Sequence, residues 1–142
     1  MLTLLVPVDG SAFSDRALQY AIARAQRSAG GALVHLLNVQ TPAAGVNVKM
    51  FVSSESLNAY YRDEGMKILE PLVARLRAAG IPAEHHIGVG NVGEVVVAYA
   101  VDKGCDEIVM GTHGRGGLLG SVLGSVAQNV VQLARVPVVL VK

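Results

Sequence analysis

Apolar runs and helical patterns alternate along this chain of 142 residues. Residues 2–8 and 32–39 are nearly continuous apolar runs, which are typical of parallel strands covered on both faces. Between them, apolar positions recur at helical spacing and predict a helix that ends near residue 28. Ser11 or Ser14 is the expected N-cap of this helix, because a serine oxygen accepts from the free N–H groups of the first turn.

The middle of the chain repeats this alternation with a longer helix. Residues 53–79 have apolar positions at helical spacing. A proline inside a helix costs about 3 kcal/mol, so Pro71 predicts a kink or a break. Residues 83–89 alternate apolar and polar positions, which indicates a half-exposed strand at a sheet edge. Residues 40–52 have no clear period and are predicted to form a loop.

The last third of the chain completes the pattern. Asn91 followed by Glu94 resembles a capping box and predicts a helix to about Lys103. A buried strand, a helix and a final strand are predicted at residues 107–110, 125–135 and 136–141. The order of elements is then β-α-β-α-β-α-β-α-β, without repeat or linker. It predicts a single α/β domain over residues 1–142, an open parallel five-stranded sheet with helices on both faces.

A glycine-rich segment joins the fourth predicted strand to the last helix. Its spacing is Gly111-x2-Gly114-x9-Gly124-Ser125. Glycine lets the backbone approach a ligand closely, and the N–H groups and dipole at a helix start attract anions. No lysine precedes Ser125, so this is not a Walker A loop. The segment predicts a phosphate-binding loop, and the alternative is a flexible connection that binds nothing.

The same spacing resembles the nucleotide-binding signature of the universal stress protein family. The resemblance covers nearly the whole chain and includes Val6-Pro-Val-Asp9-Gly-Ser11, Leu36-Leu-Asn-Val39 and Val136-Pro-Val-Val-Leu-Val141. It implies the adenine nucleotide alpha hydrolase-like fold, with strand order 3-2-1-4-5. Strands one and four are then neighbours, and open α/β sheets bind ligands at such a switch point. Family members with the glycine signature generally bind ATP.

The resemblance and the loop together assign residues to a nucleotide site. Asp9 matches a residue near the adenosine or a phosphate-bound metal, and a turn or helix N-terminal role is the alternative. Val39 matches a position whose backbone meets adenine, and otherwise it is only a core residue. The predicted cofactor is ATP, or another adenine nucleotide, with Mg²⁺. The predicted nucleotide-binding residues are Pro7, Val8, Asp9, Val39, Gly111, Thr112, His113, Gly114, Arg115, Gly124, Ser125 and Val126.

Within the loop, position suggests a role for each part. Gly111, Thr112 and Gly114 are expected to lie against ribose and phosphate. The N–H groups of Gly124, Ser125 and Val126 are expected to face the distal phosphates. His113 and Arg115 either add positive charge to the site or face solvent.

Other candidate motifs receive plainer interpretations. Residues 88–93 match the pattern G-x-G-x-x-G, but a Rossmann fingerprint follows the first strand and needs an acidic residue at the end of the next. They are interpreted as a turn bordering the nucleotide crevice. His85 and His86 point to opposite faces of a strand and cannot chelate one ion together. His35 is interpreted as a core residue and Cys105 as a packing residue, and no metal ligand is predicted.

Composition narrows the range of partners. The chain is 51% hydrophobic and 16% charged, which fits a folded domain. A net charge of +1 and an aromatic content of 4% give no reason to expect a nucleic-acid or membrane partner. The single cysteine excludes an intrachain disulfide and fits a reducing, cytoplasmic setting. Residues 1–8 lack a basic segment and are too short for a signal peptide or a membrane span.

Together these features predict an ATP-binding regulatory or stress-response module. Enzymatic turnover is not expected, because the loop supplies no obvious base for phosphoryl transfer. The alternatives are a slow ATPase or an adenylate-using transferase, and a nucleotide-free structural dimer. The resemblance also implies a homodimer in which the last strands, Val136 to Val141, pair antiparallel across a two-fold axis. A neighbouring element that covers this edge is the alternative.

Overall fold

The computed structural model of the chain describes residues 1–42, 54–115 and 123–142. Most of the predicted loop at residues 40–52, and residues 116–122 of the glycine-rich segment, lie outside this part. In the described ranges five strands alternate with four helices. They are β1 (Leu2–Pro7), α1 (Ala12–Gln26), β2 (Ala32–Gln40), α2 (Ser54–Ala78), β3 (Ala83–Val89), α3 (Val92–Asp102), β4 (Glu107–Gly111), α4 (Ser125–Leu133) and β5 (Val138–Val141).

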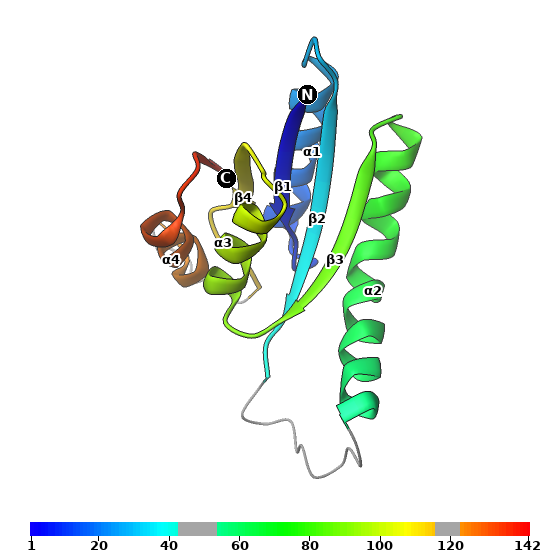
Figure 1. The fold of residues 1–142 in the computed structure, drawn as a ribbon, viewed down its shortest axis with the longest axis vertical. Coiled ribbons are helices and arrows are strands. Elements are labelled where there is room, and N and C mark those ends of the chain that lie inside the picture. The colour runs from blue at the N-terminus through cyan, green and yellow to red at the C-terminus, as the bar shows by residue number, and fades with distance from the viewer. Residues whose placement is uncertain (43–53, 116–122) are drawn as a thin grey trace.

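The strands form one parallel sheet in the order β3-β2-β1-β4-β5, as expected. Figure 1 shows α2 beside β3 and the pair α3 and α4 together on the other side of the sheet. One core cluster joins the sheet to α1 and α2, and the other joins it to α3 and α4. The chain therefore leaves β1 toward one face and leaves β4 toward the opposite face.

Burial along β1 explains its central place in the sheet. Leu4, Leu5 and Val6 are fully buried, because neighbouring residues of a strand point to opposite faces and both faces are covered. Leu4 and Val6 pack in the α1–α2 cluster, and Leu5 packs in the α3–α4 cluster. The continuous apolar run in the sequence is thus the signature of this doubly covered strand.

Helix α2 is continuous through Pro71, so the predicted break is absent. A proline at this position removes the hydrogen bond to the carbonyl of Lys67. Both residues are exposed, so water can bind that carbonyl. Leu69, Leu72 and Leu76 of the same helix are buried against the sheet, and their packing keeps the helix intact across the proline.

Strand β3 is an edge strand, as its alternating pattern predicted. Its His86 meets His35 of β2, with Nε2 of His86 2.9 Å from Nδ1 of His35. Burial lowers the pKa of both rings below the ordinary value of 6.5. Both rings are therefore neutral at pH 7, and the protonated nitrogen of one ring donates to the unprotonated nitrogen of the other. His35 is only 3% exposed, which confirms its interpretation as a satisfied core residue.

The remaining predicted elements shift only at their ends. Ser11 is the N-cap of α1, and its side chain accepts from the N–H of Ser14. Asn91 caps α3 in the same way through the N–H of Glu94. Strand β5 begins at Val138, two residues later than expected. No helix among the described residues has both the length and the apolar character needed to cross a membrane.

Candidate functional site

A cavity of about 520 Å³ lies where β1 and β4 end. Its walls come from the turn after β1, the end of β2, the start of α3, and the loop and helix that follow β4. Every predicted nucleotide-binding residue except Thr112 lines it. The cavity thus occupies the switch point of the sheet, where the connections after β1 and β4 leave toward opposite faces.

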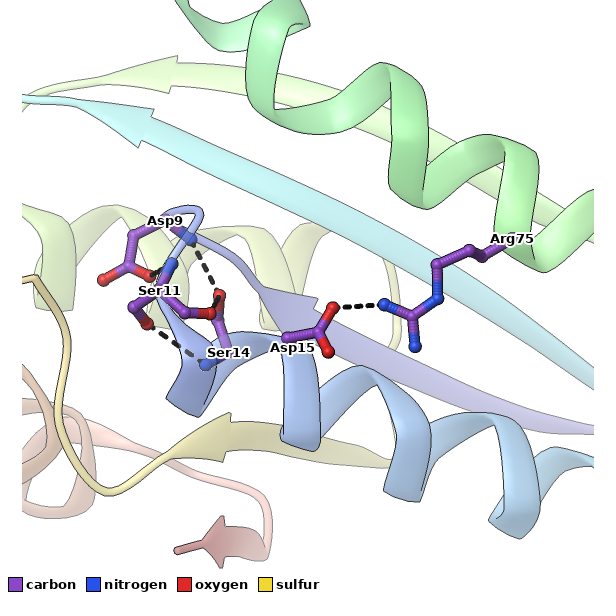
Figure 2. Close-up of polar contacts among 5 residues, drawn as sticks. All are labelled: Asp9, Ser11, Ser14, Asp15 and Arg75. Atoms are coloured by element: carbon purple, nitrogen blue, oxygen red, sulfur yellow. Dashed lines mark hydrogen bonds and ion pairs between the residues drawn. The ribbon is translucent and has the colours of Figure 1, made fainter.

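Asp9 shapes one wall of the cavity through hydrogen bonds to the backbone. Its Oδ1 accepts from the N–H of Ser11 at 2.9 Å, and its own N–H donates to Oγ of Ser14 at 3.3 Å. Figure 2 shows these contacts closing the turn between β1 and α1. Gly10 takes a φ of 82° within this turn, a conformation that favours glycine.

The second oxygen of Asp9 holds the glycine-rich loop. Oδ2 accepts from the N–H of Arg115 at 3.0 Å, and a Cβ at Gly114 would lie only 2.5 Å from it. Burial acts to raise the pKa of Asp9, but hydrogen bonds from Ser11, Arg115 and Ser14 outweigh it and hold that pKa below 3.8. At neutral pH the cavity therefore contains a carboxylate that anchors the loop to β1.

Two of the signature glycines lie in close contact with other atoms of the protein. A Cβ at Gly111 would lie 2.8 Å from Cβ of Phe13, so this glycine lets α1 approach β4. A Cβ at Gly124 would lie 3.2 Å from both Cα of His113 and the carbonyl oxygen of Thr112. These two glycines leave room for neighbouring protein atoms, whereas the sequence suggested that they leave room for a ligand.

Thr112 connects the last strand to the last helix. Its N–H donates to the carbonyl of Val141 at 2.9 Å, and its own carbonyl accepts from the N–H of Gly124 at 2.7 Å. The expectation that the Gly124 N–H faces a phosphate is therefore wrong. Thr112 is 5% exposed, and its hydroxyl lies 3.0 Å from Nδ1 of His113. Thr112 is not among the described lining residues, but it holds Gly124, which lines the cavity, in place.

The N-terminus of α4 opens into the cavity without a side-chain cap. Gly124 is the N-cap and makes no such bond, and the first turn contains no acidic residue. The other two helices with a described cap differ: Ser11 and Asn91 cap α1 and α3, and Asp15 and Glu94 lie in their first turns. Among the described residues, the positive end of α4 is thus compensated neither by its N-cap side chain nor by an acid in its first turn. Ser125, Val126 and Ala127, its first three residues, all line the cavity.

The side of the cavity that lies over β2 is apolar. Leu37 and Val39 of β2 line it together with Val92, from the first turn of α3. Asn38 is 2% exposed, and its Nδ2 donates to the carbonyl of Val8 at 2.8 Å. This bond fixes the end of β1 against β2. One side of the cavity suits a flat apolar group, and the other side suits an anion.

Several lining residues were not predicted from the sequence. Leu37 precedes Val39 by two positions on the same face of a strand, and Gln128 follows Ser125 by one helical turn. The strand and helix periods contain a signal for both. The inclusion of Val92 depends on how α3 packs over the sheet, which no local pattern reveals. The unpredicted lining residues are Ser14, Leu37, Val92, Met110, Leu123, Ala127 and Gln128.

The remaining motifs have structural roles. A Cβ at Gly88 would lie 2.7 Å from Val95, and one at Gly93 would lie 2.9 Å from Asn129, so this second glycine motif allows close packing of α3. Burial raises the pKa of the Cys105 thiol to about 11, which supports packing over reactivity. Within the described ranges, no group of three or more His, Cys, Asp or Glu side chains is placed to hold a metal ion.

Comparison with known proteins identifies relatives of the whole chain. A model of the universal stress protein family matches residues 1–142. Universal stress protein YxiE of Bacillus subtilis is 31% identical over 145 residues, covering 98% of this chain and 97% of YxiE. The solved structure of MJ0577, from Methanocaldococcus jannaschii, has a TM-score of 0.87 at 30% identity. The match covers 99% of this chain and 95% of the MJ0577 chain.

A solved structure of a universal stress protein in complex with cAMP is also similar. Its TM-score is 0.72 at 27% identity, and the match covers 99% of this chain and 97% of that one. The likeness to each of these proteins extends over nearly the whole of both chains.

Proposed function

This chain belongs to the universal stress protein family, and we propose that it binds ATP in the cavity beside Asp9 as a nucleotide-dependent regulatory module. One observation carries the proposal: the N-terminus of α4 enters the cavity without a side-chain cap on Gly124 and without an acidic residue in its first turn. A phosphate there would satisfy free N–H groups and the helix dipole together. The related structure in complex with cAMP supports an adenine nucleotide as the source of that phosphate.

The two sides of the cavity suggest how such a nucleotide lies. The adenine fits the apolar side, against Leu37 and Val39, where a flat ring removes apolar surface from water. The phosphates then extend over the glycine-rich loop to the N–H groups of Ser125 and Val126. The proposed contact residues are Pro7, Val8, Asp9, Val39, Gly111, His113, Gly114, Arg115, Gly124, Ser125 and Val126, with Thr112 positioning Gly124.

Magnesium would enter with the nucleotide. Asp9 is the only carboxylate among the described lining residues, and Mg²⁺ commonly combines one or two carboxylates with phosphate oxygens and water. The proposed role of Asp9 is to hold this ion through water while it anchors the loop.

A regulatory role is proposed over turnover because Asp9 is a poor base. Its pKa lies below the ordinary value, and both of its oxygens already accept from backbone N–H groups. A general base works best when its pKa lies near the operating pH. Occupancy, and the change of shape or partner that follows it, is therefore the proposed output. The cytoplasm, which supplies ATP, is the proposed compartment.

Replacement of Ser125 by proline tests the helix N-terminus directly. Proline suits the first position of a helix and lacks the N–H that would meet the phosphate. The preceding Gly124 has φ −71° and ψ 164°, an extended conformation that a following proline permits. We expect Ser125→Pro to weaken ATP binding by roughly 10- to 100-fold in calorimetric titration, the range for a lost hydrogen bond to a charged group.

Ser125→Ala is the matched control, because it removes only the hydroxyl and keeps the N–H. It should bind ATP within a few-fold of the wild type, and both variants should unfold at similar temperatures. Equal ATP affinity for the proline and alanine variants would contradict the proposed phosphate position. An absence of binding heat for ATP, ADP and AMP with the wild type would instead favour a nucleotide-free structural dimer.

A further inference from the structure

A second cavity, of about 380 Å³, adjoins the turn that follows β1. It lies between the start of α1 and the middle of α2. Gly10, Ser11 and Ser14 form its wall on the α1 side, and Ile68, Pro71 and Leu72 form its wall on the α2 side. Of the described lining residues, only Ser14 and Arg115 are shared by both cavities, so the second cavity offers a largely separate set of groups.

Positive charge dominates the second cavity. Lys67 and Arg75 reach it from α2, and Arg115 reaches it from the loop after β4. Asp15 is the only acidic residue among the described lining residues. Three cationic side chains thus face one carboxylate, although the chain as a whole has a net charge of only +1. A cleft with such an excess of one sign attracts an ion of the other.

Two of these cations have weak or partial partners. Figure 2 shows Arg75 reaching from α2 to the carboxylate of Asp15 on α1. This single contact leaves other guanidinium N–H groups free to donate, because arginine has five. Nζ of Lys67 lies 2.9 Å from Oε1 of Glu64, but the lysine side chain is 70% exposed. Exposed pairs of this kind contribute little to stability, so an anion can compete for the lysine.

Arg115 holds its charge over the cavity without an acidic partner among the described residues. Its guanidinium lies against Gly10, where a Cβ would come within 2.8 Å of the terminal nitrogen. Any larger residue at position 10 would displace this group as well as strain the turn. The glycine therefore leaves room for a guanidinium that has no acidic partner among the described residues, in the cavity that Lys67 and Arg75 also line.

We propose that this second cavity binds a phosphate group, either inorganic phosphate or the phosphate of a small phosphorylated molecule. The planar fork of a guanidinium matches two phosphate oxygens, and a lysine ammonium adds a point charge. Arg75 binds the phosphate from α2, Arg115 binds it from the loop after β4, and Lys67 donates from the rim. The site shares Ser14 and Arg115 with the nucleotide cavity, whereas Lys67 and Arg75 line only the second cavity among the described residues, so the two sites are tested separately.

Titration of the ¹⁵N-labelled protein with inorganic phosphate, at constant ionic strength, tests the proposal. Amide signals of Gly10, Asp15 and Ile68 should shift along a saturating curve. Signals of Ser125 and Val126 report the nucleotide cavity separately. Shifts that stay confined to Ser125 and Val126, or that never saturate, would overturn the second site.

Three charge variants give opposite expectations. Lys67→Gln should weaken phosphate binding by about fivefold, because it removes one of the three cations that line the cavity. Asp15→Asn should strengthen binding by a similar factor, because it removes the competing carboxylate from Arg75. Arg77→Gln is the matched control, since Arg77 is an exposed residue of the same helix outside the cavity. Equal weakening by Arg77→Gln and Lys67→Gln would overturn the proposal.

A final pair of titrations separates the sources of phosphate. With ATP present at saturation, inorganic phosphate and glycerol 3-phosphate should still shift Gly10 and Ile68. Tighter binding of glycerol 3-phosphate would assign the cavity to a phosphomonoester, and tighter binding of the inorganic ion would assign it to free phosphate. If ATP alone moved these signals and abolished their response to phosphate, the cavity would hold the end of the nucleotide and no second ligand.

Discussion

Asp9 joins two parts of the chain that are 106 residues apart. One carboxylate oxygen accepts from Ser11 in the turn after β1, and the other accepts from Arg115 in the loop after β4. The carboxylate thereby holds the glycine-rich loop after β4 against the turn after β1, beside the cavity. Its negative charge strengthens both bonds, because hydrogen bonds to ionised groups are stronger than neutral ones.

Asp9→Asn should destabilise the protein by about 1–3 kcal/mol at pH 7, since the amide cannot accept both bonds through oxygens. The folded protein holds the pKa of Asp9 below 3.8, so its stabilising effect is complete above the unfolded pKa. This effect disappears as the pH falls through the lower, folded pKa. Urea unfolding of both proteins from pH 7 to pH 3 measures the difference.

The difference between the two proteins isolates Asp9 from the other acids that titrate in this range. It should be largest near neutral pH and should shrink below about pH 4, where Asp9 begins to take up a proton. A difference that stayed constant down to pH 3 would show that the Asp9 charge does not anchor the loop.

At the residue scale, spacing revealed which glycines matter but could not reveal why. Gly111 and Gly124 stand where the signature requires them, yet Phe13 and Thr112 occupy the space beside their Cα atoms. A ligand and a neighbouring side chain both require glycine, so the sequence cannot distinguish the two. The pairing of the Gly124 N–H with Thr112 also depends on a tertiary contact that no local rule describes.

Among the elements, α2 contains the two residues that a helix tolerates least. Pro71 and Gly65 both lie within its 25 residues. Gly65 is buried beneath β3, and a Cβ there would lie 2.9 Å from both Cδ1 and Cγ1 of Ile87. The glycine allows close contact between helix and edge strand, which offsets its low helix propensity.

Gly65→Ala should therefore destabilise the protein, although alanine favours a helix by about 1 kcal/mol over glycine. The added methyl displaces Ile87, and overpacking costs about 1–3 kcal/mol. Chemical denaturation gives the free energy of unfolding. In an Ile87→Ala background the same change should become neutral or stabilising, because the space is then free. A loss of equal size in both backgrounds would exclude the contact as the cause.

At the element scale, hydrophobic periods located the strands and helices well. The runs of β1 and β2 are continuous because both faces are covered. β3 is the edge strand that its alternating sequence predicted, but its burial does not alternate, since Val89 is exposed and Gly88 is buried. The sequence overestimated the disruption of the helix by Pro71, because helix propensity counts only the local free-energy cost of the proline. Burial of Leu69, Leu72 and Leu76 outweighs that cost, and this burial becomes known only once the helix is placed on the sheet.

At the scale of the whole molecule, β5 is the last strand of the sheet, and we propose that the homodimer implied by the sequence resemblance pairs through it. The carbonyl of Pro137 accepts from Ile108 of β4, and that of Val141 accepts from Thr112, the residue after β4. Backbone groups alternate sides along a strand, so the N–H and carbonyl groups of Val138 and Leu140 face away from β4. An antiparallel copy of β5 would pair with these outward groups.

Val138→Pro should weaken such a dimer by at least about tenfold, because each of the two copies loses the Val138 N–H as a main-chain donor across the interface. Proline is tolerated at the first residue of a strand and on an edge, so the monomer should fold. Val138→Ala removes the same side chain but keeps the N–H, and it should remain dimeric. Sedimentation across a range of concentrations compares the two, and identical association of both would exclude pairing through this edge.

The position of the cavity was predictable because it follows from topology. Once β1 and β4 are neighbours, Asp9 and Gly111 end at the same side of the sheet, and the switch point lies between them. The apolar wall was less predictable, since Val92 arrives from a helix that crosses over the sheet. The charge of the second cavity was not predictable at all, because Lys67, Arg75 and Arg115 converge only in the folded protein.

Thr112 has one further consequence. Its amide is committed to the terminal strand and its carbonyl to the start of α4, and both bonds are shorter than 3.0 Å. If β5 or the start of α4 shifts, the other element must shift with it or one of these two hydrogen bonds must break. A partner that binds along the outer edge of β5 is thus coupled to the wall of the cavity through the two main-chain hydrogen bonds of Thr112.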